Sequence, residues 1–309
     1  MPTVLLPYQP IVLLNTISKL FEKVIGERMQ FLMISNNFIH IYQLGGLKQK
    51  ATSDAEVVLT HFIHMGWIKN CTTSMLAFNI IQFFPSLNYY LLSLILNKAS
   101  FDTKVSTFFQ NYLIGRKTKY LWNSFSSPFF NVDIGVGQEP ALFLILSALY
   151  LSPIFHIFEK QLKNLKIPIS TLSFVDDRLL IAQDNSMTIS NVNLFYIYNI
   201  ISNLLTKCGL TMEHEKTEVF YFSRLQGVFN LPSLDLTSIG ESVLHPKTTW
   251  HYLGFIFDHK LLFHQYIDFY ANKAISTIKC IKMLGNSLRG LNPNEKGHLY
   301  RCCTILIAF

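Results

Sequence analysis

Two adjacent carboxylates are the residues whose spacing most directly suggests chemistry. Asp176 and Asp177 end the segment SFVDD and are followed at once by a second apolar segment, RLLIAQ. Holding two negative charges beside a core is costly unless a cation neutralises them, and a hard divalent ion such as Mg²⁺ does so with oxygen ligands. An ordinary acidic hairpin turn would have the same sequence, so this pattern alone does not separate a metal site from a turn.

A second candidate position lies in the apolar segment MLAFNII, residues 75–81. Two-metal phosphoryl chemistry needs a further carboxylate on a strand beside the acidic turn, so that both ions are held. We expect this segment to be that strand, yet its polar residue is an amide, Asn79. The chain continues into QFFPSLN, which contains Phe84.

The elements that would position these residues follow from hydrophobic periodicity. Strands are expected at residues 75–81, on both sides of the acidic turn, at TEVFYFSR and in WHYLGFIFD. In the first helix, Leu20, Val24 and Met29 form the predicted apolar stripe. Strand pairs mixed with helices in irregular order indicate an α+β fold. The predicted helices cover about 17–34, 54–69, 86–97 (capped by Ser86) and 186–208, with an uncharged helix from Ala141.

The composition favours a polyanionic partner. The chain has 309 residues, a net charge of +7 and a pI near 9.0, which suits nucleic acid or an anionic lipid surface. Half of the residues are hydrophobic and only 15% are charged, so a disordered chain is excluded. The five cysteines are scattered, with no CxxC pair. We therefore expect free thiols and an intracellular protein, nuclear or cytoplasmic.

Two further patterns have competing interpretations. Residues 141–158 are uncharged over 18 residues, which fits either a membrane span or a fully buried helix, and the buried helix is favoured. His298, Cys302 and Cys303 could suggest a metal, but no second ligand pair has suitable spacing, so we expect no zinc.

Seven stretches resemble, in their order and spacing, the motifs of reverse transcriptases. They are most similar to those of non-LTR (LINE-type) retrotransposons, and their amino-acid sequences resemble those of fungal elements most. The resemblance covers nearly the whole chain. The stretches are PIVLLNTISKLFEKVIGERM, QLGGLKQKATSDA, LAFNIIQFFPSLN, IGVGQ with ALFLILSALYLSPIF, SFVDD, GLTMEHEKTEVFYFSR and WHYLGFIFD.

This resemblance implies a right-hand polymerase with an antiparallel palm sheet, packed helices, and fingers and thumb that hold template and primer. Residues 1–70 would be partial fingers, 71–245 the palm with the FVDD turn, and 246–309 the primer grip and a partial thumb. The implied cofactor is Mg²⁺. The implied partners are an RNA template, a DNA primer and deoxynucleoside triphosphates, with no obligate protein partner and no membrane.

The resemblance also implies roles for single residues. Asp176 corresponds to the metal-binding carboxylate of the family, Asp177 to its less demanding neighbour, and Phe84 to the aromatic gate that excludes a 2′-OH. Lys216 corresponds to a lysine proposed as general acid for pyrophosphate. The remaining matches are the nucleotide-positioning residues Gly135, Gln138, Lys48 and Lys50, and the primer-grip residues Tyr252, Leu253 and Gly254. From the residues alone, the three lysines also fit solvated loops and an exposed charged turn.

The chain departs from the family within these motifs. Asn79 stands where the family has a metal-bridging aspartate, which removes one negative charge from a site that neutralises two Mg²⁺ ions. Arg178 follows FVDD where relatives have a small or neutral residue. The other departures are Glu139 and Pro140 for a Gly-Ser pair, Phe143 and Leu144 for Ser-Pro, and Gln9 for an arginine.

We therefore expect a reverse transcriptase domain fragment, a truncated and degenerate copy whose DNA synthesis is impaired at Asn79. The start at Met1, just before the first motif, and the end within TILIAF favour a fragment. One alternative is a non-enzymatic remnant that binds nucleic acid, partly through a late helix with Lys279, Lys282 and Arg289. A less favoured alternative is a membrane-associated protein.

Overall fold

The computed structural model describes residues 15–99, 101–132, 135, 141–165, 169–175, 177–224, 231–237, 242–284 and 290–305, apart from the side chains of residues 122, 141 and 143. The chain forms two compact units: unit 1 contains residues 1–221 and 225–246, and unit 2 contains residues 222–224 and 247–309. The names fingers, palm and thumb for the three predicted segments stay predictions. Of the residues singled out in the sequence, Gln9, Gln138, Glu139, Pro140, Asp176 and Arg289 lie outside the described residues.

A four-stranded sheet with strand order β6-β7-β1-β8 organises unit 1. β7 pairs antiparallel with β6 on one side and with β1 on the other. The predicted α+β fold with an antiparallel sheet and packed helices is confirmed. The strands are β1 (Thr72–Ile80), β6 (Ile169–Phe174), β7 (Asp177–Asp184) and β8 (Met212–Phe222).

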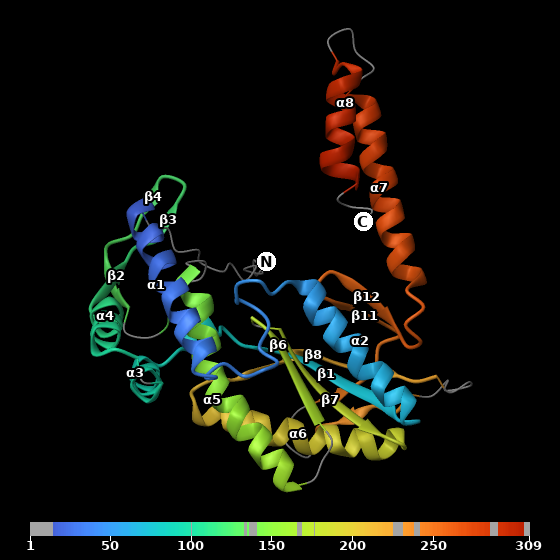
Figure 1. Ribbon diagram of the computed structural model, residues 1–309, viewed down its shortest axis with the longest axis horizontal. Helices are drawn as coiled ribbons and strands as arrows, with labels where there is room; N and C mark the ends of the chain where they lie inside the picture. The colour runs from blue at the N-terminus through green and yellow to red at the C-terminus, as the bar shows by residue number, and fades with distance from the viewer. Residues whose placement is uncertain are drawn as a thin grey trace, which may run out of the picture. The chain divides into compact units, whose positions relative to one another are not determined.

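Helices cover both faces of this sheet (Figure 1). On one face lies α2 (Thr52–Ile68), where a Cβ added to Gly66 would be 2.8 Å from Thr73 Oγ1 of β1. On the other face, Leu76 of β1 and Leu180 of β7 share a buried cluster with residues of α6 (Met187–Lys207). Because alternate side chains of a strand point to opposite faces, residue 79 lies on the α2 face with Thr73.

The uncharged helix predicted from Ala141 is α5 (Ala141–Leu165). Its residues Leu146, Tyr150, Phe155 and Phe158 are buried in the core of unit 1. Among the described residues, no helix is long and apolar enough to cross a membrane.

The buried face of α1 (Thr16–Ser35) differs from the predicted stripe. Met29 is buried as expected, but Leu20 and Val24 are exposed, so the prediction is wrong for two of its three residues. α1 packs against α5 (Figure 1) through the opposite face, which includes the buried Glu22. Burial raises the pKa of the Glu22 carboxyl. Hydrophobic periodicity could not predict which face of α1 is buried, because this helix has apolar residues on both sides.

The cap predicted at Ser86 is wrong by two residues. Phe84–Ser86 forms the 3₁₀ turn η1, with Pro85 inside it, so α3 begins later and Asn88 Oδ1 accepts from the N–H of Leu91 at 3.1 Å. The remaining elements of unit 1 are α3 (Tyr89–Lys98), α4 (Thr103–Leu113) and the antiparallel pairs β2 (Arg116–Thr118) with β5 (Phe130–Val132), β3 (Leu121–Trp122) with β4 (Phe125–Ser126), and β9 (Leu234–Asp235) with β10 (Val243–Leu244).

Unit 2 contains one hairpin followed by helices. The strand structure predicted in WHYLGFIFD is present as an antiparallel hairpin. The carboxylate of Asp258 at its end accepts backbone N–H groups of Leu262 and Phe263, which lead into the next helix. The elements are β11 (Thr249–Tyr252), β12 (Phe255–Asp258), α7 (His264–Met283), α8 (Pro293–Leu299) and a π-helical segment, Tyr300–Ile305.

Candidate active site

The acidic turn lies in the hairpin between β6 and β7. Phe174 and Asp177 form the last pair of this hairpin, so its turn is tight. Val175 has a φ of 57°, a left-handed conformation that is strained for a β-branched residue. The predicted pair of apolar strands around a tight turn is confirmed, while Asp176 itself lies outside the described residues.

A glycine-rich loop holds this turn at the edge of the sheet. The N–H of Ser173 donates to the carbonyl of Tyr42 at 3.0 Å, and the carbonyl of Ser173 accepts from the N–H of Leu44 at 2.8 Å. A Cβ added to Gly45 would lie 2.1 Å from the backbone nitrogen of Val175. Gly45 is therefore a positioning residue that the sequence interpretation missed, although the Gly-Gly pair in QLGGLK signals close backbone approach.

Asn79 lies across from Asp177 on the neighbouring strand. The strand register pairs Phe78 of β1 with Arg178 of β7, and the next position brings the amide to the carboxylate. The surroundings of the half-buried Asn79 amide orient its nitrogen toward two oxygens: Nδ2 is 3.1 Å from Asp177 Oδ1 and 3.2 Å from the carbonyl oxygen of Phe78. The structure thus joins two of the predicted metal ligands as hydrogen-bond donor and acceptor.

Arg178 places a cation under the same turn. Its side chain is 1% exposed, its Nη2 donates to the carbonyl of Val175 at 2.9 Å, and its guanidinium carbon lies 5.2 Å from the centre of the Phe83 ring. Because adjacent residues of a strand point to opposite faces, Arg178 occupies the core side while Asp177 occupies the α2 side. A fixed positive charge here lowers the attraction of the turn for a further cation.

The structure brings Gly135 to the turn that carries Phe84. The N–H of Gly135 donates to the carbonyl of Leu87 at 3.0 Å, and a Cβ at this residue, whose φ is +79°, would lie 2.3 Å from the carbonyl oxygen of Pro85. The carbonyl of Gly135 also accepts a hydrogen bond from Arg116 Nη1 at 3.2 Å. These two predicted nucleotide-binding positions therefore share one local structure, and Arg116 is a basic residue beside them that the prediction did not include.

The three predicted lysines are exposed. Lys48 Nζ lies 3.6 Å from Glu27 Oε1 of α1, and Lys216 Nζ lies 2.9 Å from Glu213 Oε1, both on β8. Lys50 is exposed on the glycine-rich loop. These positions fit the solvated interpretation of the lysines, and their functional roles stay predictions.

The predicted primer-grip residues are the last residue of β11 and the two turn residues of the β11–β12 hairpin in unit 2. Leu253 and Gly254 both have positive φ angles, of 49° and 89°, as a tight two-residue hairpin turn requires. Tyr252 is buried, with its ring stacked at 4.8 Å on Trp250. Tyr270 of α7 donates from its hydroxyl to the carbonyl of Gly254 at 2.7 Å, which fixes the turn to the helix.

A comparison with protein families identifies this arrangement. The family described as reverse transcriptase (RNA-dependent DNA polymerase) matches residues 7–257, which include the acidic hairpin, Asn79 and the β11–β12 turn. The chain belongs to the reverse transcriptase family. The non-LTR type and the fungal origin stay predictions.

Solved structures similar to this reverse transcriptase chain include telomerases. Apo telomerase from Candida tropicalis truncated from its C-terminal domain is 15% identical, with a TM-score of 0.53, over 80% of this chain and 45% of that chain. Telomerase from Candida tropicalis in complex with a TWJ fragment of telomeric RNA is 14% identical, with a TM-score of 0.54, over 95% of this chain and 47% of that chain. The chain thus spans less than half of either telomerase chain, and the likeness concerns the fold alone. No curated protein matches the chain.

Members of the reverse transcriptase family generally use divalent metal ions. Within the part of the chain that the structure describes, no group of three or more His, Cys, Asp and Glu side chains could hold such an ion. Asn79 and Asp177, the described members of the predicted ligand set, supply one carboxylate between them, and the Asn79 orientation that satisfies its neighbours turns an N–H group toward that carboxylate. An N–H donor offers no lone pair to a cation.

Proposed function

We propose that this chain is the reverse transcriptase domain of a non-LTR retrotransposon of fungal type, in which RNA-directed DNA synthesis is impaired at Asn79. The observation that carries the impairment is the 3.1 Å contact between Asn79 Nδ2 and Asp177 Oδ1. The amide supplies no negative charge, and it also occupies a carboxylate oxygen that a cation would need. Both effects act at the same position of the palm.

The substrates we infer are an RNA template, a DNA primer and deoxynucleoside triphosphates. The family description as an RNA-dependent DNA polymerase supports this class, and one structure of similar fold, a telomerase, is a complex with an RNA fragment. Phe84 and Gly135 would border the incoming nucleotide, since they lie in one local structure. The tight turn at Leu253 and Gly254 would support the primer.

Primer extension on an RNA template with Mg²⁺ tests the proposal by comparing the chain with its Asn79→Asp variant. Loss of several kcal/mol of transition-state stabilisation slows a reaction by about a thousand-fold, so the variant should extend the primer faster by roughly that factor. Asn88→Asp is a matched control, because it makes the same change of amide to carboxylate at the exposed cap of α3. It should leave the rate unchanged.

Equal activity of the chain and the Asn79→Asp variant would refute the role of residue 79. Silence of both would show that other departures, such as Glu139 and Pro140, also block synthesis. That result favours the second candidate function, a non-enzymatic protein that binds nucleic acid. The net charge of +7 supports this function. Such a protein would bind an RNA–DNA duplex without incorporating nucleotides in either form.

A further inference from the structure

An antiparallel ribbon over residues 116–132 concentrates basic and aromatic residues in unit 1. β2 pairs with β5 at its base, and β3 pairs with β4 at its tip, away from α4 (Figure 1). Its sequence, RKTKYLWNSFSSPFFNV, has three basic residues, five aromatic residues and no acidic residue. Aromatic side chains normally supply core area, yet four here are exposed: Tyr120 at 57%, Phe125 at 62%, Phe129 at 67% and Phe130 at 39%.

One face of this ribbon combines two positive charges with an exposed ring. Lys117 pairs with Asn131 across β2 and β5, so these two side chains share a face. Strand alternation places Lys119 on the same face, and its Nζ lies 5.5 Å from the centre of the Phe129 ring. All four side chains are exposed. We call this set of four residues the lysine face.

We propose that the lysine face binds single-stranded nucleic acid. Lys117 and Lys119 would contact backbone phosphates, and an unpaired base would stack on Phe129. Sites for single strands combine basic side chains that follow the backbone with aromatic rings on which bases stack. The absence of any acidic residue from the ribbon sequence makes its charge complementary to such a polyanion.

The position of the ribbon indicates which single strand this is. Arg116, the first residue of β2, donates to the carbonyl of Gly135, which packs on the turn that carries Phe84. The lysine face therefore begins beside the candidate nucleotide site, where the unpaired part of a template would pass. This last step rests on the proposed function, whereas the binding of a single strand does not.

A lipid surface fits the ribbon less well than a nucleic acid. Membrane-surface elements insert an apolar face and keep their charges on the opposite face. Here Phe129 lies among charged and polar side chains. Phe130 pairs with Thr118, so it points to the other face, where its ring lies 5.1 Å from that of Tyr120. Because the aromatic residues are divided between two faces, neither face is purely apolar.

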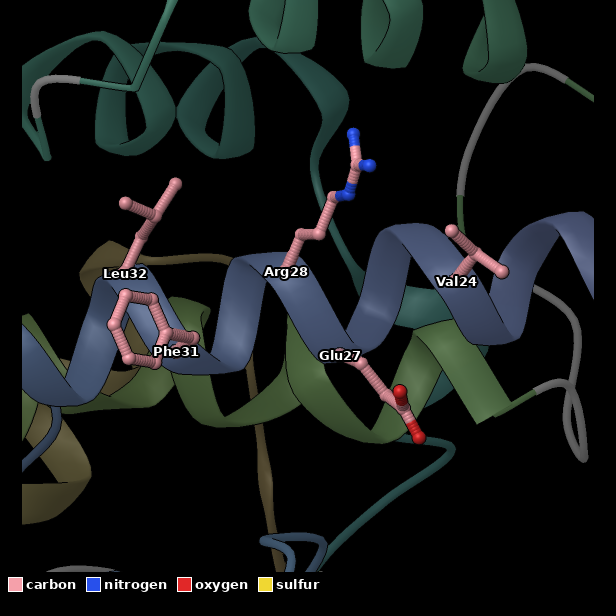
Figure 2. Close-up of a pocket in the computed structure, with 5 residues that line it drawn as sticks. All are labelled: Val24, Glu27, Arg28, Phe31 and Leu32. Atoms are coloured by element: carbon pink, nitrogen blue, oxygen red, sulfur yellow. The ribbon is translucent and has the colours of Figure 1, made fainter.

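Fluorescence anisotropy of the full chain with a labelled oligouridylate of about 12 nucleotides tests the proposal. Phe129→Ala should weaken binding by about tenfold, because the stack with one base is lost, and Phe129→Trp should retain the affinity. Phe31→Ala is a matched control, since Figure 2 shows Phe31 on the surface of α1 and its exposed fraction is 71%. This control should bind as the original chain does.

The phosphate contacts have their own test. Replacing Lys117 and Lys119 together by Gln should lower the log–log salt slope by about 1.4, at roughly 0.7 per contact with a single strand. Replacing Lys98 and Lys104 by Gln removes the same charge from exposed positions of α3 and α4 and should leave the slope unchanged. Circular dichroism melts establish that all variants are folded.

Three results would each overturn the proposal: no binding of the oligouridylate, a loss below about twofold in Phe129→Ala, or equal salt slopes in the two double variants. Vesicles of phosphatidylcholine with about one-third phosphatidylserine test the lipid alternative. Vesicle binding that Phe129→Ala abolishes, with unchanged RNA binding, would assign the face to lipid instead. None of these measurements requires DNA synthesis, so their failure is distinct from the failure of the proposed role of Asn79.

Discussion

The position of the acidic turn depends on a residue without a reactive side chain, Gly45. Gly45 lets the backbone of the glycine-rich loop reach Ser173, and thereby supports the left-handed Val175. Strained backbone of this kind persists only where the surrounding structure fixes it. The position of Asp177 relative to Asn79 therefore depends on a contact made by a loop more than a hundred residues earlier in the chain.

Gly45→Ala should destabilise the protein by about 3 kcal/mol or more, since the new Cβ meets backbone atoms that cannot move aside. Urea unfolding monitored by circular dichroism would measure this loss. Gly115→Ala is the matched control, because nothing lies within 4 Å of its Cβ and only its φ of +70° is unfavourable, which costs about 1–2 kcal/mol. Equal losses in the two variants would mean that the loop does not dock on the turn in solution.

Part of the site could be predicted from residue types alone. The register that sets Asn79 beside Asp177 follows from two apolar strands of similar length, and alternation then fixes which side chains share a face. The burial of Arg178 and the role of Gly45 could not be predicted in this way. Both depend on contacts between segments distant in sequence, and a charged residue after an acidic turn is normally exposed.

At the scale of elements, α5 anchors the segment that leads into the glycine-rich loop. His40 is 3% exposed, its Nε2 lies 2.9 Å from Glu159 Oε1 of α5, and its backbone N–H donates to Ser152 Oγ at 3.1 Å. Its Nδ1 accepts from the N–H of Tyr42 at 3.4 Å. The loop that holds the acidic turn is therefore attached to the core helix by one buried histidine.

Burial lowers the pKa of His40 below its usual value of 6.5, helped by His156 and Lys163 and opposed by Glu159. As the pH falls below about 6.5, the imidazole of His40 binds a proton in the unfolded chain but not in the folded chain. The contribution of His40 to the free energy of unfolding is therefore fully present above that pH and decreases below it. His40→Gln should flatten the decrease between pH 7.5 and 5.5, and Glu159→Gln should steepen it. Urea midpoints measured across this range would contradict the assignment if the two variants changed the slope in the same direction.

Periodicity predicted which elements exist better than it predicted which faces they bury. The extents of α1, α2 and α6 agree with the sequence pattern within about two residues. The stripe of α1 was wrong because Leu20 and Val24 belong to a second apolar face. The start of α3 was also wrong, because Pro85 sits in a 3₁₀ turn that delays the helix, and such a turn resembles a helix start in sequence.

At the scale of the whole molecule, the basic residues are distributed over both units, and in unit 2 several of them are exposed on α7. Ala274 is the single buried residue of this helix as described, while Lys273, Lys279 and Lys282 are exposed. The surface of α7 is mixed in character, since Ile275 and Ile278 are exposed as well. A helix of this kind suits contact with a phosphate backbone better than burial in a core.

If α7 contacts phosphates, affinity for an RNA–DNA duplex should fall linearly with salt on a log–log scale, by roughly 0.7–0.9 per contact. Replacing Lys279 and Lys282 together by Glu should therefore reduce the slope by roughly 1.5 units. Lys98 and Lys207, exposed on α3 and α6 of unit 1, give a matched double variant with the same change of charge. Fluorescence anisotropy between about 50 and 200 mM salt measures all three proteins. Equal reductions in both double variants would mean that net charge, rather than α7, supplies the binding, and a slope near zero would rule out a phosphate-directed role for this molecule.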